Sequence, residues 1–175
     1  MRKVTFGGAN SLDNYFARED HSVDWLMWSD EAGQIMKEFW KRIDTMLMGR
    51  ITYEVALKRT KGADVFGGVK TYICSRTMKK APKGAEVADD AVKLLRELKK
   101  QDGKEILIMG GGNLATSLFE NDLIDEIGFN VHPVLLGSGI PLFYPMKKQV
   151  NLELIECKPF KNGCVHMLYR VKHGK

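Results

Sequence analysis

The chain has 175 residues, of which 44% are hydrophobic and 28% charged, a composition that suits one globular domain with a sizeable core. No apolar run approaches the length of a membrane span, the N-terminus does not resemble a signal peptide, and three scattered cysteines without a C-x-x-C pair fit reduced thiols in the cytoplasm. The net charge is +5, but the lysines occur in short groups without interleaved aromatic residues, so we expect no nucleic-acid partner and no membrane partner.

The first half of the chain alternates predicted strands and helices. A strand over 3–9 precedes a helix over 29–44, and a short strand over 45–49 precedes a short helix over 50–58. A β-rich run follows over 69–75. Because apolar residues recur three and four apart in the first helix, its buried stripe is expected to contain Ile35, Met36, Phe39, Trp40 and Ile43.

The second half begins with helical segments and ends in strands. A helix over 89–101 has acidic residues first and lysines last, which matches the helix dipole. A continuous apolar strand over 105–109 leads to a helix over 114–121, and alternation predicts a half-buried strand over 125–137. A hairpin is expected over 151–172. This order predicts one α/β domain over residues 1–175, a three-layer sandwich whose central, mainly parallel sheet has antiparallel C-terminal edge strands.

Three strand-to-loop junctions carry residues that suit a phosphate, namely glycine, hydroxyl or arginine residues. They read "LMGRITYE", "ICSRT" and "MGGGNLAT". The N–H groups and the dipole at a helix N-terminus favour an anion, and glycine lets that anion come close. Three such junctions at strand ends suggest a ligand with several phosphates, such as a dinucleotide. Taken alone, the glycine triplet is equally consistent with a tight turn, and neither G-x-G-x-x-G nor a P-loop is present.

Four segments, "MGRITYE", "ICSRT", "MGGGNLATSLFENDLIDEI" and "HPVLLGSGIPLF", resemble the dihydrofolate-reductase-like superfamily. More narrowly, they resemble the reductase domain of riboflavin biosynthesis and its single-domain relatives. The resemblance implies NADPH as the hydride donor. It also implies cofactor phosphates on Gly49, Arg50 and Thr52, the adenosine ribose and its 2′-phosphate on Ser75 and Arg76, and the pyrophosphate on a turn made by Gly110, Gly111, Gly112, Asn113 and Leu114.

The substrate side has weaker signals. "SLDNYFA" resembles a family motif in which glycine stands at the position of Asn14, and Asn tolerates the left-handed conformation that such a turn requires. Asp13 is the candidate catalytic acid, although it can equally form a local turn. Trp25 and Trp28 are candidates to stack on a flat heterocycle, with a core or interface role as the commoner alternative. The four histidines lack metal-ligand spacing, so we expect no metal.

These residues and the resemblance imply an NADPH-dependent reductase of a small heterocycle or carbonyl compound. The alternatives are a pyrimidine-phosphate reductase of riboflavin biosynthesis and a non-catalytic NADP-binding protein. Dihydrofolate is disfavoured as the substrate because the first helix carries Ile35 and Met36 where dihydrofolate reductases place a carboxylate. The family resemblance also implies a homodimer, whose edge we expect to contain Ile155, Cys157, Val165, Met167 and Tyr169.

Overall fold

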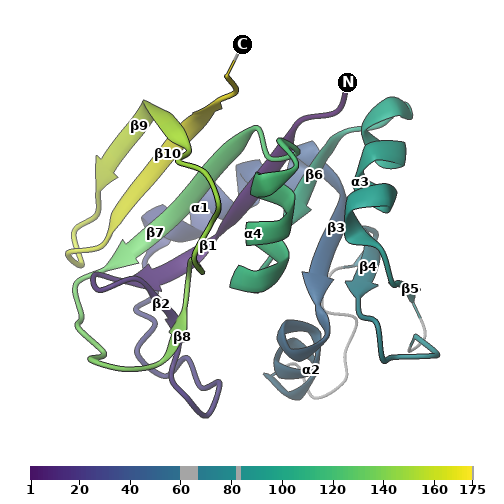
Figure 1. Cartoon of the computed structure of the whole chain (residues 1–175). Helices are drawn as coiled ribbons and strands as arrows, with labels where there is room; N and C mark the ends of the chain where they lie inside the picture. The colour runs from purple at the N-terminus through teal and green to yellow at the C-terminus, as the bar shows by residue number, and fades with distance from the viewer. Residues whose placement is uncertain (60–66, 82–83, 175) are drawn as a thin grey trace.

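A computed structural model describes residues 1–59, 67–81 and 84–174. Within these ranges, eight strands form one sheet in the order β5-β4-β3-β6-β1-β7-β10-β9, and β2 and β8 form a separate small pair (Figure 1). The strands are β1 Val4–Ser11, β2 Tyr15–Ala17, β3 Ile43–Gly49, β4 Lys70–Cys74, β5 Ala85–Ala88, β6 Glu105–Ile108, β7 Glu126–His132, β8 Ile140–Pro141, β9 Asn151–Pro159 and β10 Val165–Lys172.

The sheet is parallel from β5 to β7, and β10 and β9 add to it in antiparallel fashion. Its centre is β1, whose Phe6 lies opposite Ile108 of β6 and Ile127 of β7. The mainly parallel sheet with antiparallel C-terminal edge strands is therefore confirmed. Consecutive parallel strands need a crossover connection, which explains why helices separate most strands of the first two thirds of the chain.

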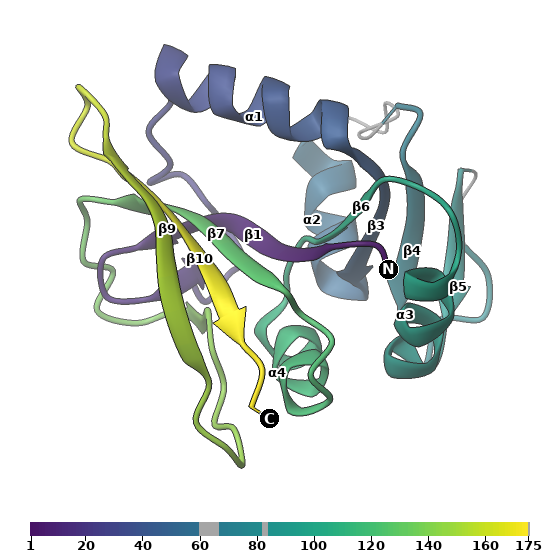
Figure 2. The same cartoon turned by 90° about the horizontal axis from the view of Figure 1, so that it is seen from above.

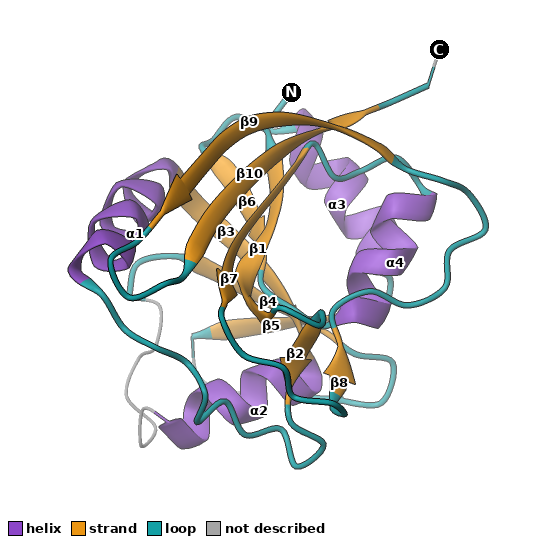
Figure 3. Cartoon of the chain, turned by 90° about the vertical axis from the view of Figure 1, so that its left-hand side faces the viewer, coloured by secondary structure: helices purple, strands orange, loops and turns teal. Residues whose placement is uncertain are grey.

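In the described part of the chain, four helices cover the two faces of the sheet, so the expected three-layer arrangement is also confirmed. They are α1 Asp30–Arg42, α2 Arg50–Arg59, α3 Ala91–Lys100 and α4 Gly112–Glu120. Figure 2 shows α1 on the face opposite α3 and α4, and Figure 3 shows the same arrangement from the side. Tyr53 of α2 lies in one cluster with Phe39 and Trp40 of α1, so α2 covers the same face as α1. Among the described residues, no helix is both long and apolar enough to cross a membrane.

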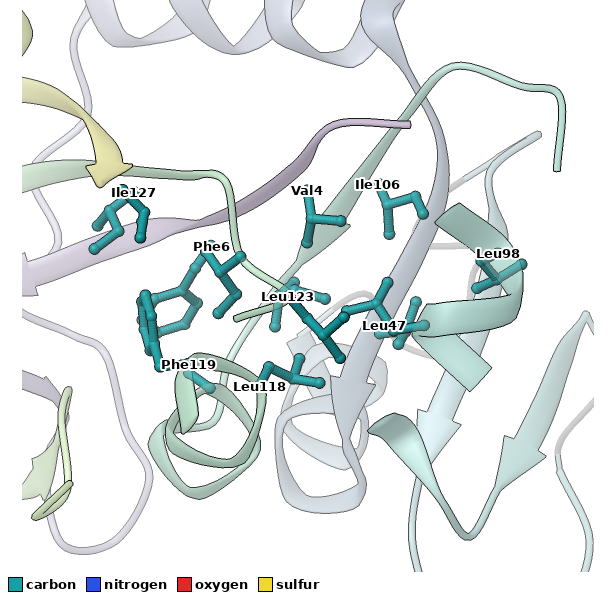
Figure 4. Packing of buried hydrophobic residues seen from close by; sticks show 14 of the residues in the cluster. Val4, Phe6, Leu47, Leu98, Ile106, Leu118, Phe119, Leu123 and Ile127 are labelled. Carbon is teal, nitrogen blue, oxygen red and sulfur yellow. The ribbon is translucent and has the colours of Figure 1, made fainter. Parts of the chain in front are cut away.

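The core forms on both faces because neighbouring residues of a strand point to opposite sides. Leu47 of β3 joins Val4, Phe6 and Ile106 in the cluster beneath α3 and α4, as Figure 4 shows. Met46 and Met48, its neighbours along the strand, lie in a second cluster with Phe39 and Trp40 of α1. Strand β3 thus packs against helices on both faces of the sheet.

The boundaries of several predicted elements are different in the structure. The first helix ends at Arg42, and Ile43, which we expected on its buried stripe, is the first residue of β3. Met36 of that stripe is exposed, because the helix covers the sheet with Phe39 and Trp40 instead. The predicted strand over 125–137 ends at His132, just before Pro133, and α4 begins inside the glycine triplet.

Candidate functional site

The three junctions that carry glycine or basic residues lie at one edge of the sheet. Gly49 of β3 lies opposite Cys74 of β4, and Leu47 lies opposite Ile108 of β6, so the three strands end at nearly the same level. In Figure 1 this edge faces down, toward α2 and the small pair of β2 and β8. Ligands of open α/β sheets bind beyond the carboxyl ends of the strands, and this edge is therefore the candidate site.

A backbone hydrogen bond joins two of these junctions directly. The N–H of Gly49 donates to the carbonyl oxygen of Gly110 at 3.3 Å. Gly110 has a φ of +64°, in the left-handed region, and a Cβ at this position would lie 3.1 Å from both the Phe16 ring and the Thr52 hydroxyl. Only glycine therefore fits at position 110, and the Thr52 hydroxyl of α2 lies against the turn that leads into α4.

The other two glycines of the triplet have different surroundings. A Cβ on Gly112 would lie 2.7 Å from Tyr144 and 2.8 Å from the Leu142 carbonyl oxygen, so this glycine permits close packing. Gly111 has ordinary extended φ and ψ, and the nearest atom to its Cβ position is the Thr52 hydroxyl at 3.8 Å. Position 111 is thus the one with free space around it. The turn therefore combines the two interpretations of the triplet, since Gly110 and Gly112 permit tight packing and Gly111 leaves room for a ligand.

The N-terminus of α4 lacks a side-chain cap. Gly111 is the N-cap residue and makes no side-chain cap hydrogen bond, so the N–H groups of the first turn are not satisfied by a capping side chain. Such groups favour an anionic ligand. The two remaining residues of the predicted turn diverge, because Asn113 is exposed whereas Leu114 packs against the main hydrophobic cluster. Asn113 remains a candidate contact for a ligand, while Leu114 packs α4 against the hydrophobic core.

The second helix begins at Arg50, directly after Gly49. Its first turn contains no acidic side chain, so the positive end of the helix dipole is not neutralised there. The Arg50 guanidinium donates from Nη1 to the Glu54 Oε1 oxygen at 2.8 Å, one turn further along the helix. Gly49, Arg50 and Thr52 are therefore together at one helix end, as the sequence predicts, with Arg50 turned toward Glu54.

The third junction, at the end of β4, is built around Ser75. Its hydroxyl accepts from the backbone N–H groups of Thr77 at 3.3 Å and Met78 at 3.0 Å, which folds residues 75–78 into a tight turn. Arg76 lies on this turn with an exposed side chain. The hydroxyl of Ser75 therefore shapes the turn, and Arg76 is the residue whose charge is available to a ligand.

Asp13 is an anchor for a distant loop. Its carboxylate accepts from the Ser11 hydroxyl at 2.6 Å and from the backbone N–H groups of Leu136 at 3.1 Å and Gly137 at 2.8 Å. The hydrogen bond from Ser11, followed by those from the backbone, lowers the pKa of Asp13. Asn14 next to it has a φ of +63°, so the conformation expected of the residue in the glycine position of the motif is confirmed.

The two tryptophans of the predicted substrate wall lie in different environments. Trp25 is buried, with its ring edge-on to His132 at 5.3 Å between centroids, and its buried indole N–H has no partner among the described residues. Trp28 is 71% exposed, and its ring lies beside Gly33 at the start of α1. The two tryptophans therefore differ in exposure, Trp25 as a core residue and Trp28 as a side chain open to solvent.

His132 holds the segment that contains Trp25. Its Nδ1 atom accepts from the Met27 backbone N–H at 3.2 Å and lies 3.4 Å from the Cys164 sulfur. Burial lowers the pKa of His132 and raises the pKa of the Cys164 thiol, so both groups are neutral near pH 7. This agrees with a structural role for His132. Among the described residues no group of three or more metal-binding side chains gathers at one place.

A cavity of about 510 Å³ lies between residues 20–24, which precede Trp25, and α2. The segment contributes charged and polar residues, including Asp20, His21 and Asp24, and α2 contributes one face with residues spaced three and four apart. That face contains Arg50, Ile51, Glu54, Val55 and Lys58. Arg50 thus belongs both to the helix end beside the glycine turn and to the wall of the cavity.

Sequence reasoning missed this cavity and the residues that line it. The spacing of Ile51, Val55 and Lys58 on a short helix after "MGR" was the available signal, but nothing local indicates that residues 20–24 lie opposite them. Phe16 was missed for the same reason, since its contact with Gly110 joins residues far apart in the chain.

Comparison with known proteins places these motifs in a family. The model of the RibD C-terminal domain matches residues 2–166. The uncharacterized protein YwjB of Bacillus subtilis is 34% identical over 167 residues, covering 91% of this chain and 92% of its own length. A crystal structure from Shewanella sp. PV-4, assigned by its name to riboflavin biosynthesis, has a TM-score of 0.84 at 25% identity and covers 99% of this chain and 100% of that one.

A more distant structure supports the same fold. Dihydrofolate reductase of Enterococcus faecalis, complexed with NADP(H), has a TM-score of 0.71 at 17% identity and covers 98% of this chain and 97% of that one. At this level of identity the likeness concerns the fold alone. The glycine turn, the Asp13 loop and the cavity stand on an architecture that dihydrofolate reductase shares.

Proposed function

The chain belongs to the family of the RibD C-terminal domain, and from this premise we propose that it is an NADPH-dependent reductase of a small heterocycle or carbonyl compound. The observation that carries the proposal is the junction of Gly49, Thr52 and Gly110, where the uncapped N-terminus of α4 and the acid-free N-terminus of α2 lie side by side. Two helix ends at one place favour a ligand with more than one phosphate.

The residues at this edge fit a dinucleotide phosphate cofactor. Gly111 has room around its Cβ position, and Thr52 offers a hydroxyl beside it. In the proposal the pyrophosphate lies on the N–H groups that follow Gly111 and on Thr52, with Arg50 as its cation. The exposed Arg76 at the end of β4 binds the 2′-phosphate, which favours NADPH over NADH. The relative from Enterococcus faecalis, which has the same fold, is complexed with NADP(H).

The cofactor supplies the hydride, and the protein positions the acceptor. Arg50 lines the cavity of about 510 Å³ between residues 20–24 and α2, so in the proposal this cavity adjoins the cofactor site and receives the substrate. Its apolar lining residues, Val23, Ile51 and Val55, suit the faces of a small ring, while the charged ones suit polar ring substituents. The protein thus contributes proximity and orientation to hydride transfer.

Asp13 enters the proposal as a positioning residue for the loop at Leu136 and Gly137. A carboxyl whose pKa is lowered is ionised at neutral pH and holds no proton to donate. We therefore propose that the proton that accompanies the hydride comes from water. Trp25 and Trp28 are not among the residues that line the cavity, so substrate stacking on them stays a prediction without support from their placement.

A pyrimidine-phosphate reductase of riboflavin biosynthesis is the second candidate, favoured by the name of the similar protein from Shewanella sp. PV-4. Such a substrate carries a phosphate. The lining of the cavity combines three carboxylates, on Asp20, Asp24 and Glu54, with the basic residues Arg50 and Lys58, and it is therefore not specialised for an anion. This balance is the reason for preferring an unphosphorylated substrate.

We also propose that the protein is a homodimer. The edge strand β9 is exposed along all 9 of its residues, including Leu152, Leu154 and Ile155. The register places Cys157 beside Met167, and Leu154 beside Tyr169, so apolar side chains of β9 and β10 share one face. An exposed apolar edge strand invites pairing with another chain.

Turnover separates these candidates. The purified protein would be mixed with NADPH and a panel of carbonyl compounds, C=N heterocycles and aminopyrimidine ribose phosphates, and the loss of nicotinamide absorbance followed. Reduction of unphosphorylated compounds supports the first proposal. Reduction of an aminopyrimidine ribose phosphate supports the second proposal, as does restored growth when this protein is expressed in a riboflavin-requiring strain that lacks the pyrimidine-phosphate reductase. NADPH binding without turnover of any compound would indicate a non-catalytic NADP-binding protein.

A further inference from the structure

Arg50 has two competing anionic partners if the proposed function is correct. In the structure its Nη1 atom donates to Glu54 Oε1 at 2.8 Å, and both side chains are partly exposed, at 42% and 43%. In the proposed function the same guanidinium binds a cofactor phosphate. The two partners lie in different directions, because Glu54 is one helical turn nearer the C-terminal end of α2, whereas the phosphate site lies at its N-terminal end.

The cavity shows where the paired guanidinium is directed. Arg50 and Glu54 both line it, together with Lys58 from the next turn of the same helix face. Thr52, in contrast, directs its hydroxyl toward Gly110 and Gly111. The ion pair therefore holds Arg50 along the wall of the cavity, and an anion at the junction of Gly49 and Gly110 has to draw the side chain back toward the start of α2.

We propose that the Glu54 carboxylate competes with the cofactor phosphate for Arg50, so that binding of the cofactor releases Glu54 into the cavity. This inference rests on the proposed function. The exchange costs little, because the pair is exposed and lies on a helix surface at i,i+4 spacing, where ion pairs are weak. A phosphate is the stronger partner, since it binds a guanidinium with two parallel hydrogen bonds.

Release of Glu54 changes the charge of the cavity wall. Lys58 remains as the basic residue of the lining, and Glu54, which already lines the cavity, loses its guanidinium partner. Of the other two carboxylates there, Asp24 is paired with Arg18 at 2.6 Å. The cavity wall, where the substrate binds, therefore offers the unpaired Glu54 carboxylate as an acceptor only after the cofactor has bound. Glu54 is thus a positioning residue that couples the two halves of the site.

The test is a titration of NADPH against the wild type, Glu54→Gln and the control Glu38→Gln, with nicotinamide fluorescence as the signal. Glu38 is also a helical glutamate in an exposed ion pair, with Lys41 at 2.7 Å, but it lies on α1. Both variants remove one negative charge. We expect Glu54→Gln to bind NADPH about two- to fivefold more tightly than the control, the size expected when an exposed i,i+4 ion pair no longer competes for Arg50.

A double-mutant cycle identifies Arg50 as the residue through which Glu54 acts. In an Arg50→Gln background, Glu54→Gln should no longer tighten binding beyond the control. Weaker binding in Glu54→Gln would mean that Glu54 orients Arg50 for the phosphate, and unchanged binding would mean that the two do not compete. Either result overturns the inference and leaves the proposed function standing. A wild type that does not bind NADPH overturns both.

Discussion

The backbone N–H of Gly49 donates to the carbonyl oxygen of Gly110 at 3.3 Å, and this bond joins the exits of β3 and β6. It brings the first turns of α2 and α4 to one place, although their sequences are about 60 residues apart. The glycines around this bond have separable roles, which makes the proposed phosphate site open to test by single substitutions.

Gly111→Val should weaken NADPH binding without unfolding the protein. Position 111 has an ordinary extended backbone conformation and no close neighbour at its Cβ position, so a side chain fits in the free protein. The added side chain would occupy the space before the α4 N-terminus. We expect a loss of tenfold or more in affinity, because hydrogen bonds to a charged group contribute roughly 1.5–3 kcal/mol each. Unchanged affinity for NADPH in a folded variant would show that no cofactor phosphate binds at this turn.

Gly112→Ala is the matched contrast, one residue further along. Its Cβ would overlap Tyr144 and the Leu142 carbonyl oxygen at 2.7 and 2.8 Å. Overpacking of this kind typically costs about 1–3 kcal/mol, so urea denaturation should show a lower free energy of unfolding than for Gly111→Ala. Equal stability of the two alanine variants would mean that the turn packs differently.

Asp13→Ala should free the loop at Leu136 and Gly137. The two backbone N–H groups lose their carboxylate partner, and their amide hydrogen exchange should become faster, which NMR can follow residue by residue. The exchange rate of the Met109 N–H, which bonds to Leu47 within the sheet, serves as the internal reference. If the Leu136 and Gly137 amides exchange as slowly in Asp13→Ala as in the wild type, Asp13 does not anchor this loop.

Stability should fall as the pH drops below about 6.5, because the buried His132 and the half-buried His166 are held in the neutral form. Burial lowers the pKa of both His132 and His166 in the folded chain. Between the lowered pKa and the ordinary value near 6.5, the unfolded chain binds a proton that the folded chain does not, so their stabilising contribution is complete at higher pH and is lost on acidification. The slope is at most about 1.4 kcal/mol per pH unit for each group.

His132→Gln checks that assignment. Free energies of unfolding measured in urea between pH 7.5 and 5.5 should depend less on pH in the variant than in the wild type, with the remaining slope due to His166. An identical slope in both proteins would show that His132 does not titrate in this range.

Leu154→Lys should convert the proposed dimer into a monomer. Leu154 is 54% exposed on β9 and pairs with Tyr169, so the substitution places a charge on the apolar face of the edge strands without disturbing the core. Light scattering at micromolar concentration would show a dimer for the wild type and a monomer for the variant. A monomeric wild type would contradict the dimer itself.

The fold could be predicted because its signals are local. Apolar runs mark the strands, the cap at Asp90 and the basic end mark α3, and glycines mark the exits of β3 and β6. Even the αL conformation of Asn14 followed from its neighbours in the motif. Met36 was misplaced because periodicity gives the angle of a helical stripe but not how wide a surface the sheet covers.

The substrate side could not be predicted because its contacts join residues that are distant in the chain. Asp13 meets Leu136 and Gly137 more than 120 residues later. The difference in burial between Trp25 and Trp28 depends on the irregular path of residues 18–28, which His132 holds from another strand. No spacing rule applies to such a segment, so the cavity beside it appears only once the fold is known.

The most direct test of the proposed function is a pair of titrations of the wild type with NADPH and with NADH, followed by nicotinamide and tryptophan fluorescence. We predict saturable NADPH binding that is at least tenfold tighter than NADH binding, because Arg76 gains charge-assisted hydrogen bonds to the 2′-phosphate worth about 1.5–3 kcal/mol. Arg76→Ala should remove most of that difference. Absence of binding by either nucleotide would contradict the reductase proposal, and equal affinities would contradict the role of Arg76.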